Sequence, residues 1–222
     1  MKVLFCMGTM LASNMLLAQP SLDSSYASDY YKQRVAFFRM MPDRKREIVF
    51  IGNSITEHGE WQELLPHQNV INRGIGGDNT FGVLARLDEV VSSRPEKIFL
   101  LIGINDIGRG LPLEGLLNNY KRIVSYIRNK SPQTTIFIQS ILPTNDSLLK
   151  FDYLKNKNAN IKKVNKGIAH LSASEQFTFI DLFTLFADKN GQLKQEMTLD
   201  GVYLRSEAYI HWIKFLKQKK YL

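Results

Sequence analysis

The sequence predicts an α/β fold in three layers: a doubly wound, five-stranded parallel sheet with helices on both faces. Three observations support this prediction. Short apolar runs alternate with longer amphipathic segments along the chain, as in a series of βαβ units. The apolar runs are nearly continuous rather than alternating, which is typical of strands buried on both faces. The links between them are short, so the strands are expected to be parallel, with right-handed crossovers.

The five strands are expected where the apolar runs lie, at residues 48–51, 70–72, 97–102, 135–140 and 177–181. Helices are expected at residues 26–40, 80–91, 116–128, 158–171 and 206–217. The first helix stops before Pro42, because proline cannot continue a helix. In the second, Phe81, Leu84, Leu87 and Val91 fall on one apolar stripe.

The N-terminus has the composition of a secretory signal peptide, predicted to be residues 1–18, followed by a single domain at residues 19–222. Lys2 gives a positive start, the following stretch is apolar without acidic residues, and Ala18 is a small residue before the expected cut. The stretch is interrupted by polar residues and too short for a membrane anchor. The protein is therefore expected to be exported, to a bacterial periplasm or the exterior, with no transmembrane segment after cleavage.

The charge balance is basic, with 29 Lys and Arg against 21 Asp and Glu, a net charge of +8. Removing residues 1–18 removes Lys2 and leaves 28 against 21, or +7. It also removes Cys6, the single cysteine, which excludes a disulfide-stapled secreted module. The positive charge either covers solvated helix faces or attracts acidic glycans. No nucleic-acid motif accompanies it, so no nucleic-acid partner is expected.

Three polar motifs each follow a predicted strand. In the first, Gly52-Asn53-Ser54-Ile55-Thr56, Ser54 is either a nucleophile or the N-cap of a helix. The second, Asn72-Arg73-Gly74-Ile75-Gly76-Gly77-Asp78-Asn79-Thr80, has glycines that allow close backbone approach to a ligand. A helix follows it, so free N–H groups point toward the same place. The alternatives are a phosphate-binding loop and a tight turn.

The third motif is Gly103-Ile104-Asn105-Asp106, in which an amide side chain can donate to an oxyanion. The alternative is a turn-forming Asn-Asp pair. Ligands of parallel sheets bind beyond the carboxyl ends of the strands. Ser54, Gly77 and Asn105 are therefore expected to converge at one edge of the sheet.

Together the three motifs resemble those of the SGNH (GDSL-type) hydrolase family, in the same order, from residue 48 to residue 212. The resemblance implies a flavodoxin-like fold, with Ser54 as nucleophile and no cofactor or metal. It also implies an oxyanion hole made by the N–H groups of Ser54 and Gly77 and the side chain of Asn105. Residues 73–87 are similar to the branch that contains platelet-activating-factor-acetylhydrolase-like proteins and glycan O-acetylesterases.

Two positions depart from the family pattern. Asn53 stands where the family usually has Asp, directly before the nucleophile. The second is the Asp-x-x-His pair, in which His takes the proton from Ser: here Asp200 is followed by Tyr203. A phenol keeps its proton at neutral pH, so it does not readily act as the base.

Other groups near the motifs could complete the site. His58 follows Ser54 by one helical turn and is considered as a surrogate base, whereas His211 lies about two turns beyond Tyr203. Further residues expected to line the pocket are Asn53, His58, Asp78 and Asp106.

The sequence thus predicts a secreted serine ester hydrolase that removes acetyl or other short acyl groups from carbohydrates through an acyl-enzyme on Ser54. Two alternatives stay open. One is a catalytically impaired homologue that binds glycans or acyl groups in the retained pocket; the other is a structural descendant. The expected partner is a small-molecule or glycan ester.

Overall fold

The computed structural model describes residues 25–222. The predicted signal peptide, residues 1–18, lies outside the described residues. The sheet has five strands, β1 (Ile48–Gly52), β2 (Val70–Gly74), β3 (Lys97–Leu101), β4 (Thr135–Gln139) and β5 (Thr178–Ile180). Their order is β2-β1-β3-β4-β5 and every neighbouring pair is parallel. The predicted α/β fold class is confirmed.

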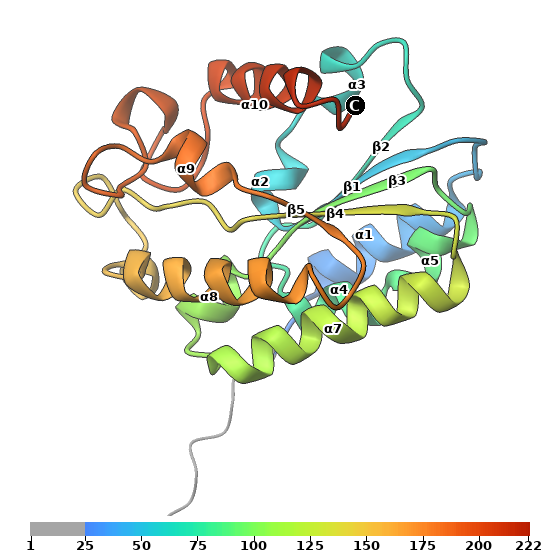
Figure 1. Cartoon of the computed structure of the whole chain (residues 1–222), viewed down its shortest axis with the longest axis horizontal. Coiled ribbons are helices and arrows are strands. Elements are labelled where there is room, and N and C mark those ends of the chain that lie inside the picture. Colours follow the sequence, from blue (N-terminus) through green and yellow to red (C-terminus); the bar gives the residue numbers. More distant parts are fainter. Residues whose placement is uncertain (1–24) are drawn as a thin grey trace, which may run out of the picture.

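Helices cover both faces of the sheet (Figure 1). One face carries α10 (Ser206–Gln218) and the short α3 (Trp61–Leu64), and the other carries α1 (Asp29–Met40), α5 (Leu87–Ser92), α7 (Leu113–Lys130) and α8 (Asn158–Leu171). The remaining helices are short: α2 (Ser54–Glu57), α4 (Thr80–Ala85), α6 (Ile104–Gly108), α9 (Leu182–Phe186) and the 3₁₀ turns η1 (Asp152–Leu154) and η2 (Gln195–Met197). In the described residues, no helix is both long and apolar enough to cross a bilayer.

The predicted helix at residues 80–91 is divided into α4 and α5, which is a correction. The break falls at Arg86, whose φ of −122° is outside the helical range. Its side chain turns inward to bind the Asp78 carboxylate and the Gly52 carbonyl. A tertiary ion pair therefore overrides a continuous helical pattern.

A column of aromatic rings fixes α3 and α10 against the sheet. Phe50, Phe99 and Phe137 are register neighbours on β1, β3 and β4, and their rings stack at 4.9 and 4.6 Å. Trp61 stacks on Phe50 at 4.1 Å, and Trp212 meets Trp61 edge-on at 5.1 Å. All of these rings except Phe137 are fully buried, so large apolar areas lock the layers together.

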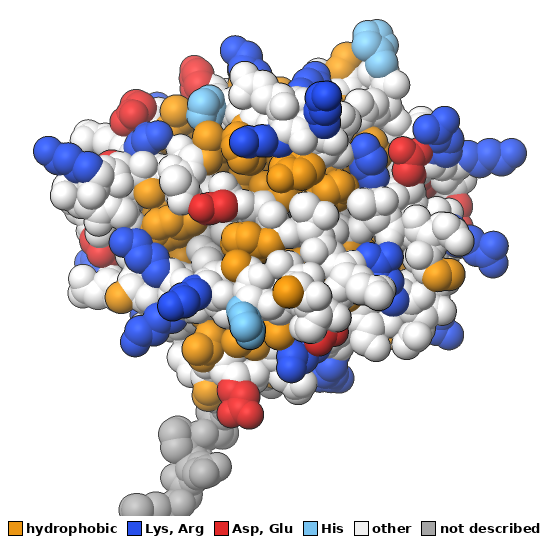
Figure 2. Space-filling model, viewed as in Figure 1, with side chains coloured by type: hydrophobic (Ala, Val, Ile, Leu, Met, Phe, Trp, Pro, Cys, Tyr) orange, Lys and Arg blue, Asp and Glu red, His pale blue; other side chains and the backbone are white. Residues whose placement is uncertain are grey.

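The register brings three loops out at one edge. Gly52 is paired with Gly74 on β2 and with Leu101 on β3, so the chain leaves these strands at the same level. Ser54, the loop after β2 and Asn105 all follow from there. On the face shown in Figure 2, Lys and Arg are scattered among acidic and apolar side chains rather than gathered in one patch.

Candidate active site

Ser54 is the first residue of α2, directly beyond β1. The Asn53 side chain caps this helix by accepting from the Ile55 N–H at 3.0 Å. Asn53 is fully buried, whereas Ser54 is partly exposed. Tyr209 on α10 donates to the Ile55 carbonyl at 2.7 Å. The hydroxyl of Ser54 is thus presented by a short helix that is held through the N–H and the carbonyl of Ile55.

The glycine loop after β2 lies against Ser54. A β-carbon added to Gly76 would come within 4.0 Å of the Ser54 β-carbon, so these two residues nearly touch. Gly77 follows with φ of +77°, a conformation that favours glycine. Gly77 is exposed, and within residues 25–222 its N–H donates no hydrogen bond. That N–H is therefore available to an anion.

Asn105 is held at the other side of the same loop. Gly103, with φ of +122°, turns the chain from β3 into α6. The Asn105 Nδ2 donates to the Asp78 carbonyl at 2.8 Å, and its Oδ1 accepts from the Tyr153 hydroxyl at 3.1 Å. An amide nitrogen carries two hydrogens, so a second donor remains for a ligand.

These contacts place the three expected residues around one loop. Gly77 lies between Gly76, which faces Ser54, and Asp78, which accepts from Asn105. A hydroxyl beside two preorganised neutral donors is an arrangement that can attack a carbonyl and stabilise the resulting oxyanion.

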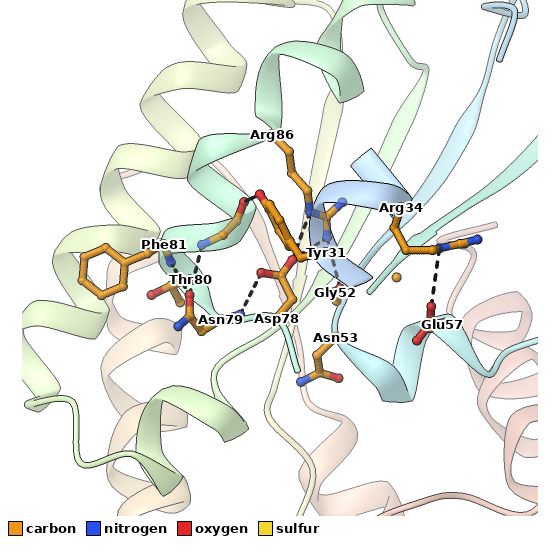
Figure 3. A network of polar contacts seen from close by, with 12 residues as sticks. Tyr31, Arg34, Gly52, Asn53, Glu57, Asp78, Asn79, Thr80, Phe81 and Arg86 are labelled. Atoms are coloured by element: carbon orange, nitrogen blue, oxygen red, sulfur yellow. Dashed lines mark hydrogen bonds and ion pairs between the residues drawn. The ribbon is translucent and has the colours of Figure 1, made fainter. Parts of the chain in front are cut away.

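Asp78 points toward Arg86 and forms a buried ion pair with it (Figure 3). The Arg86 Nη2 lies 2.8 Å from its Oδ2, and both side chains are about 1% exposed or less. Burial raises the pKa of Asp78 to about 6, although the Arg86 guanidinium opposes the rise. Arg86 also donates to the Gly52 carbonyl at 3.1 Å, so it ties the glycine loop to the end of β1.

Asp106 is also turned inward. It accepts from the Thr80 N–H and, at 2.5 Å, from the Thr80 hydroxyl, which in turn accepts from Asn119 on α7. Burial raises the pKa of Asp106, and the hydrogen bonds from Thr80 lower it in part. The structure thus gives Asn53, Asp78 and Asp106 buried positioning contacts behind the loop, while His58 among the four expected lining residues is exposed.

The segment containing Asp200 and Tyr203 forms a tight turn closed by an antiparallel bridge between Thr198 and Leu204. The Asp200 Oδ1 accepts from the N–H groups of Val202 and Tyr203, at 3.1 and 2.9 Å. The Leu199 N–H and the Thr198 hydroxyl donate to the Tyr203 carbonyl, each at 2.8 Å. This turn is therefore held by contacts among its own residues.

His58 stacks on Tyr203. Their ring centroids are 4.9 Å apart and the planes differ by 29°. Phe151 meets Tyr203 edge-on at 6.0 Å. Burial raises the pKa of Tyr153, and the nearby Tyr203 adds to the rise. The Tyr203 ring therefore joins helix α2 to the segment around η1, next to Ser54 and Asn105. His211 instead packs on Phe186 at 6.3 Å.

Most of the chain is similar to a known protein family. The profile of the GDSL-like lipase/acylhydrolase family matches residues 50–211, which include all three motifs and the Asp200 turn. The chain belongs to this family. Platelet-activating factor acetylhydrolase IB subunit alpha1 of Homo sapiens is 27% identical over 173 residues, covering 75% of this chain and 72% of that one.

Solved structures of the family share the fold. One from Streptococcus pneumonia, named for platelet activating factor, is 34% identical with a TM-score of 0.79, over 86% of this chain and 92% of that one. A GDSL-like lipase from Bacteroides thetaiotaomicron has a TM-score of 0.74 at 21% identity, over 86% and 98%. An acetylxylan esterase mutant from Geobacillus stearothermophilus has 0.61 at 16%, over 80% and 96%. The last two show the fold alone.

Several residues at this family site were not singled out from the sequence. Tyr153 lies in a segment without periodicity, so no signal pointed to its contact with Asn105. Arg109 comes four residues after Asn105, one helical turn on, and Glu57 comes three after Ser54; helical spacing could have found both. Tyr30 and Arg34 on α1 reach Glu57 from far along the chain, which only the tertiary structure reveals.

Proposed function

We propose that this chain is an exported serine ester hydrolase that removes acetyl or other short acyl groups from carbohydrates. The observation that carries the proposal is the grouping of Ser54, Gly77 and Asn105 around one loop. In the proposed reaction the Ser54 Oγ attacks the ester carbonyl, and the oxyanion accepts from the Gly77 N–H and the Asn105 Nδ2. The alcohol leaves, and water then releases the acyl group from Ser54.

The proposal assigns removal of the Ser54 proton to His58. Tyr203 occupies the position where the family pattern has its histidine, so the base must come from elsewhere. His58 is one turn beyond Ser54, and its backbone N–H closes α2 by donating to the Ser54 carbonyl at 3.0 Å. Stacking on Tyr203 restrains the imidazole beside the site. In this arrangement Tyr203 orients the base and does not accept the proton.

Two features support a carbohydrate ester. Phe151 and Tyr203 put aromatic rings beside the site, and such rings offer flat apolar faces on which a sugar ring can pack. The relatives include an acetylhydrolase, and the fold neighbours include an acetylxylan esterase. Export rests on the predicted signal peptide.

A second candidate, a glycan- or acyl-binding module without turnover, is favoured by the Asp200 turn. The Asp200 Oδ1 is already occupied by two N–H groups of its own turn, and no imidazole follows three residues later. Preorganised donors at Gly77 and Asn105 would still bind a carboxylate or acetate under this alternative.

A panel of p-nitrophenyl esters and acetylated sugars, assayed with the wild type, Ser54→Ala and His58→Ala, tests the proposal. Turnover abolished by Ser54→Ala and lowered about 100-fold or more by His58→Ala supports the hydrolase with a surrogate base. Turnover that survives Ser54→Ala unchanged contradicts it. Absence of turnover, with acetate shifting the amide signals of Gly77 and Asn105, selects the binding module.

A further inference from the structure

An open cleft lies beside the glycine loop, on the side that faces the start of α1. The cleft has a volume of about 650 Å³ and is lined by residues 25–28, Gly76, Gly77 and Arg109, so it adjoins the proposed oxyanion donor. A group attached to an ester held at Gly77 can therefore extend into this cleft.

Arg109 forms one wall of the cleft without pairing with a carboxylate. Its guanidinium donates to the Ser25 carbonyl, and at 3.2 Å to the Gly77 carbonyl. Both acceptors are neutral. Within residues 25–222 no Asp or Glu forms an ion pair with it, in contrast to Arg86 and Arg73, which pair at 2.8 and 2.7 Å. Arg109 is partly exposed, so its charge is accessible to a ligand.

The carboxylates around the cleft are already engaged. Glu57 lies beside Gly76, but Tyr30 donates to it and Arg34 lies 3.6 Å away. Asp78 is paired with Arg86. Asp106 is held by Thr80, and within residues 25–222 it forms no ion pair with Arg109. None of these carboxylates neutralises the positive charge of Arg109 by forming an ion pair with it.

We propose that Arg109 binds an anionic group, a carboxylate or a phosphate, carried by the ester substrate. The guanidinium presents five N–H donors in a planar arrangement that matches both anions, and its two contacts with the Ser25 and Gly77 carbonyls leave donors free. The same guanidinium donates to the Gly77 carbonyl. One side chain therefore contacts both the bound anion and the loop that supplies the oxyanion donor. This inference rests on the proposed function, because it takes the ester carbonyl to lie at Gly77.

The proposed preference for anionic substrates is tested by comparing the turnover of anionic and neutral acetyl esters. The probes are acetylated glucuronate, acetyl glycerol phosphate and, as the neutral reference, acetylated glucose. We expect the wild type to prefer at least one anionic ester, and Arg109→Gln to lower that preference, as a ratio of kcat/KM values, by about 10- to 100-fold. Arg109→Lys should lose less, because it keeps the charge but not the fork.

Lys130→Gln is the matched control, since it removes one positive charge at the far end of α7 from the site. It should leave the ratio unchanged. The anionic ester whose ratio falls in Arg109→Gln identifies carboxylate or phosphate as the recognised group. A wild type without preference for either anionic ester overturns the inference. So does an equal loss on anionic and neutral esters in Arg109→Gln, which would mean that Arg109 only positions the loop.

A binding experiment separates failure of this inference from failure of the proposed function. If no ester is hydrolysed, the hydrolase proposal fails, and Ser54→Ala protein is titrated with glucuronate and with glycerol phosphate. Shifts of the Gly77 and Arg109 amide signals, with affinity lowered about 10-fold or more by adding Arg109→Gln, support the anion site. Unperturbed signals, or equal affinity with and without Arg109, overturn it.

Discussion

The two halves of the candidate site are held in different ways. The glycine-loop half, residues 74–80 with residues 103–106, is fixed by buried tertiary contacts: the Asp78–Arg86 ion pair and the Asp106–Thr80 hydrogen bonds. The Asp200 half, residues 198–205, is fixed by hydrogen bonds within its own turn and by ring contacts of Tyr203.

This difference explains how one half can change while the other stays intact. A substitution in the glycine-loop half would leave a buried charge or hydroxyl without its partner, which is costly. At position 203 the backbone carbonyl accepts a hydrogen bond that holds the turn. The side chain is partly exposed and contacts other aromatic rings. A tyrosine can therefore occupy that position without disturbing the donors at Gly77 and Asn105.

The largest effect is expected from Tyr203→His, which tests whether the Asp200 half alone limits turnover. It places an imidazole three residues after Asp200, and general-base assistance is worth about 100- to 10,000-fold. We expect esterase activity to rise by a factor in that range in the His58→Ala background, where the proposed surrogate base is absent. An unchanged rate there, measured by acetate release, would show that the Asp200 half has lost more than one side chain.

Removing the cation of the buried pair should strongly destabilise the glycine-loop half. Arg86→Met leaves the Asp78 carboxylate buried without a partner, and such losses cost about 3–5 kcal/mol of unfolding free energy. Arg205→Met is the matched control in the other half, because Arg205 is exposed and donates to the Thr198 carbonyl at 2.8 Å. Its expected cost is about 1 kcal/mol. Urea unfolding giving equal costs for both would refute the contrast between the halves.

Asn105→Ala should lower kcat/KM by about 100- to 1,000-fold, the usual cost of losing one oxyanion donor. Tyr153→Phe is its control, because it removes the partner of the Asn105 Oδ1 and leaves the Nδ2 donor in place. That change should cost less than about 10-fold. If the two variants lose activity equally, the orientation of Asn105 matters more than its donated hydrogen.

The smallest effect concerns pH and Asp106. Burial raises the pKa of Asp106 in the folded chain, so the folded state holds this proton more tightly than the unfolded state. The stability that it contributes is complete below the unfolded pKa and is lost as pH rises through the folded value. Asp106→Asn stays neutral and keeps an oxygen for Thr80, so the variant should gain stability relative to wild type as the pH rises above about 4, the ordinary pKa of an unfolded Asp. A difference in urea midpoint that does not vary with pH would contradict this assignment.

Much of this protein was predictable because its signals are local. The apolar runs located all five strands, and the predicted helix at residues 158–171 agrees with α8 at both ends. The three motifs located Ser54, Gly77 and Asn105, because each follows a strand and parallel strands end at one edge. The family resemblance was likewise carried by those short motifs and is confirmed by the family match.

The tertiary structure alone decided which polar residues face the site and which lie behind it. Asp78, Asp106 and His58 are all polar neighbours of the motifs, and nothing in their spacing separates the buried ion pair from the exposed ring. The apolar pattern predicts a continuous helix through Arg86, yet Arg86 breaks the helix to reach Asp78. The stack of His58 on Tyr203 joins residues 145 positions apart. Local periodicity reports which face of an element is apolar, whereas burial and pairing of charges depend on distant segments that meet only in the folded chain.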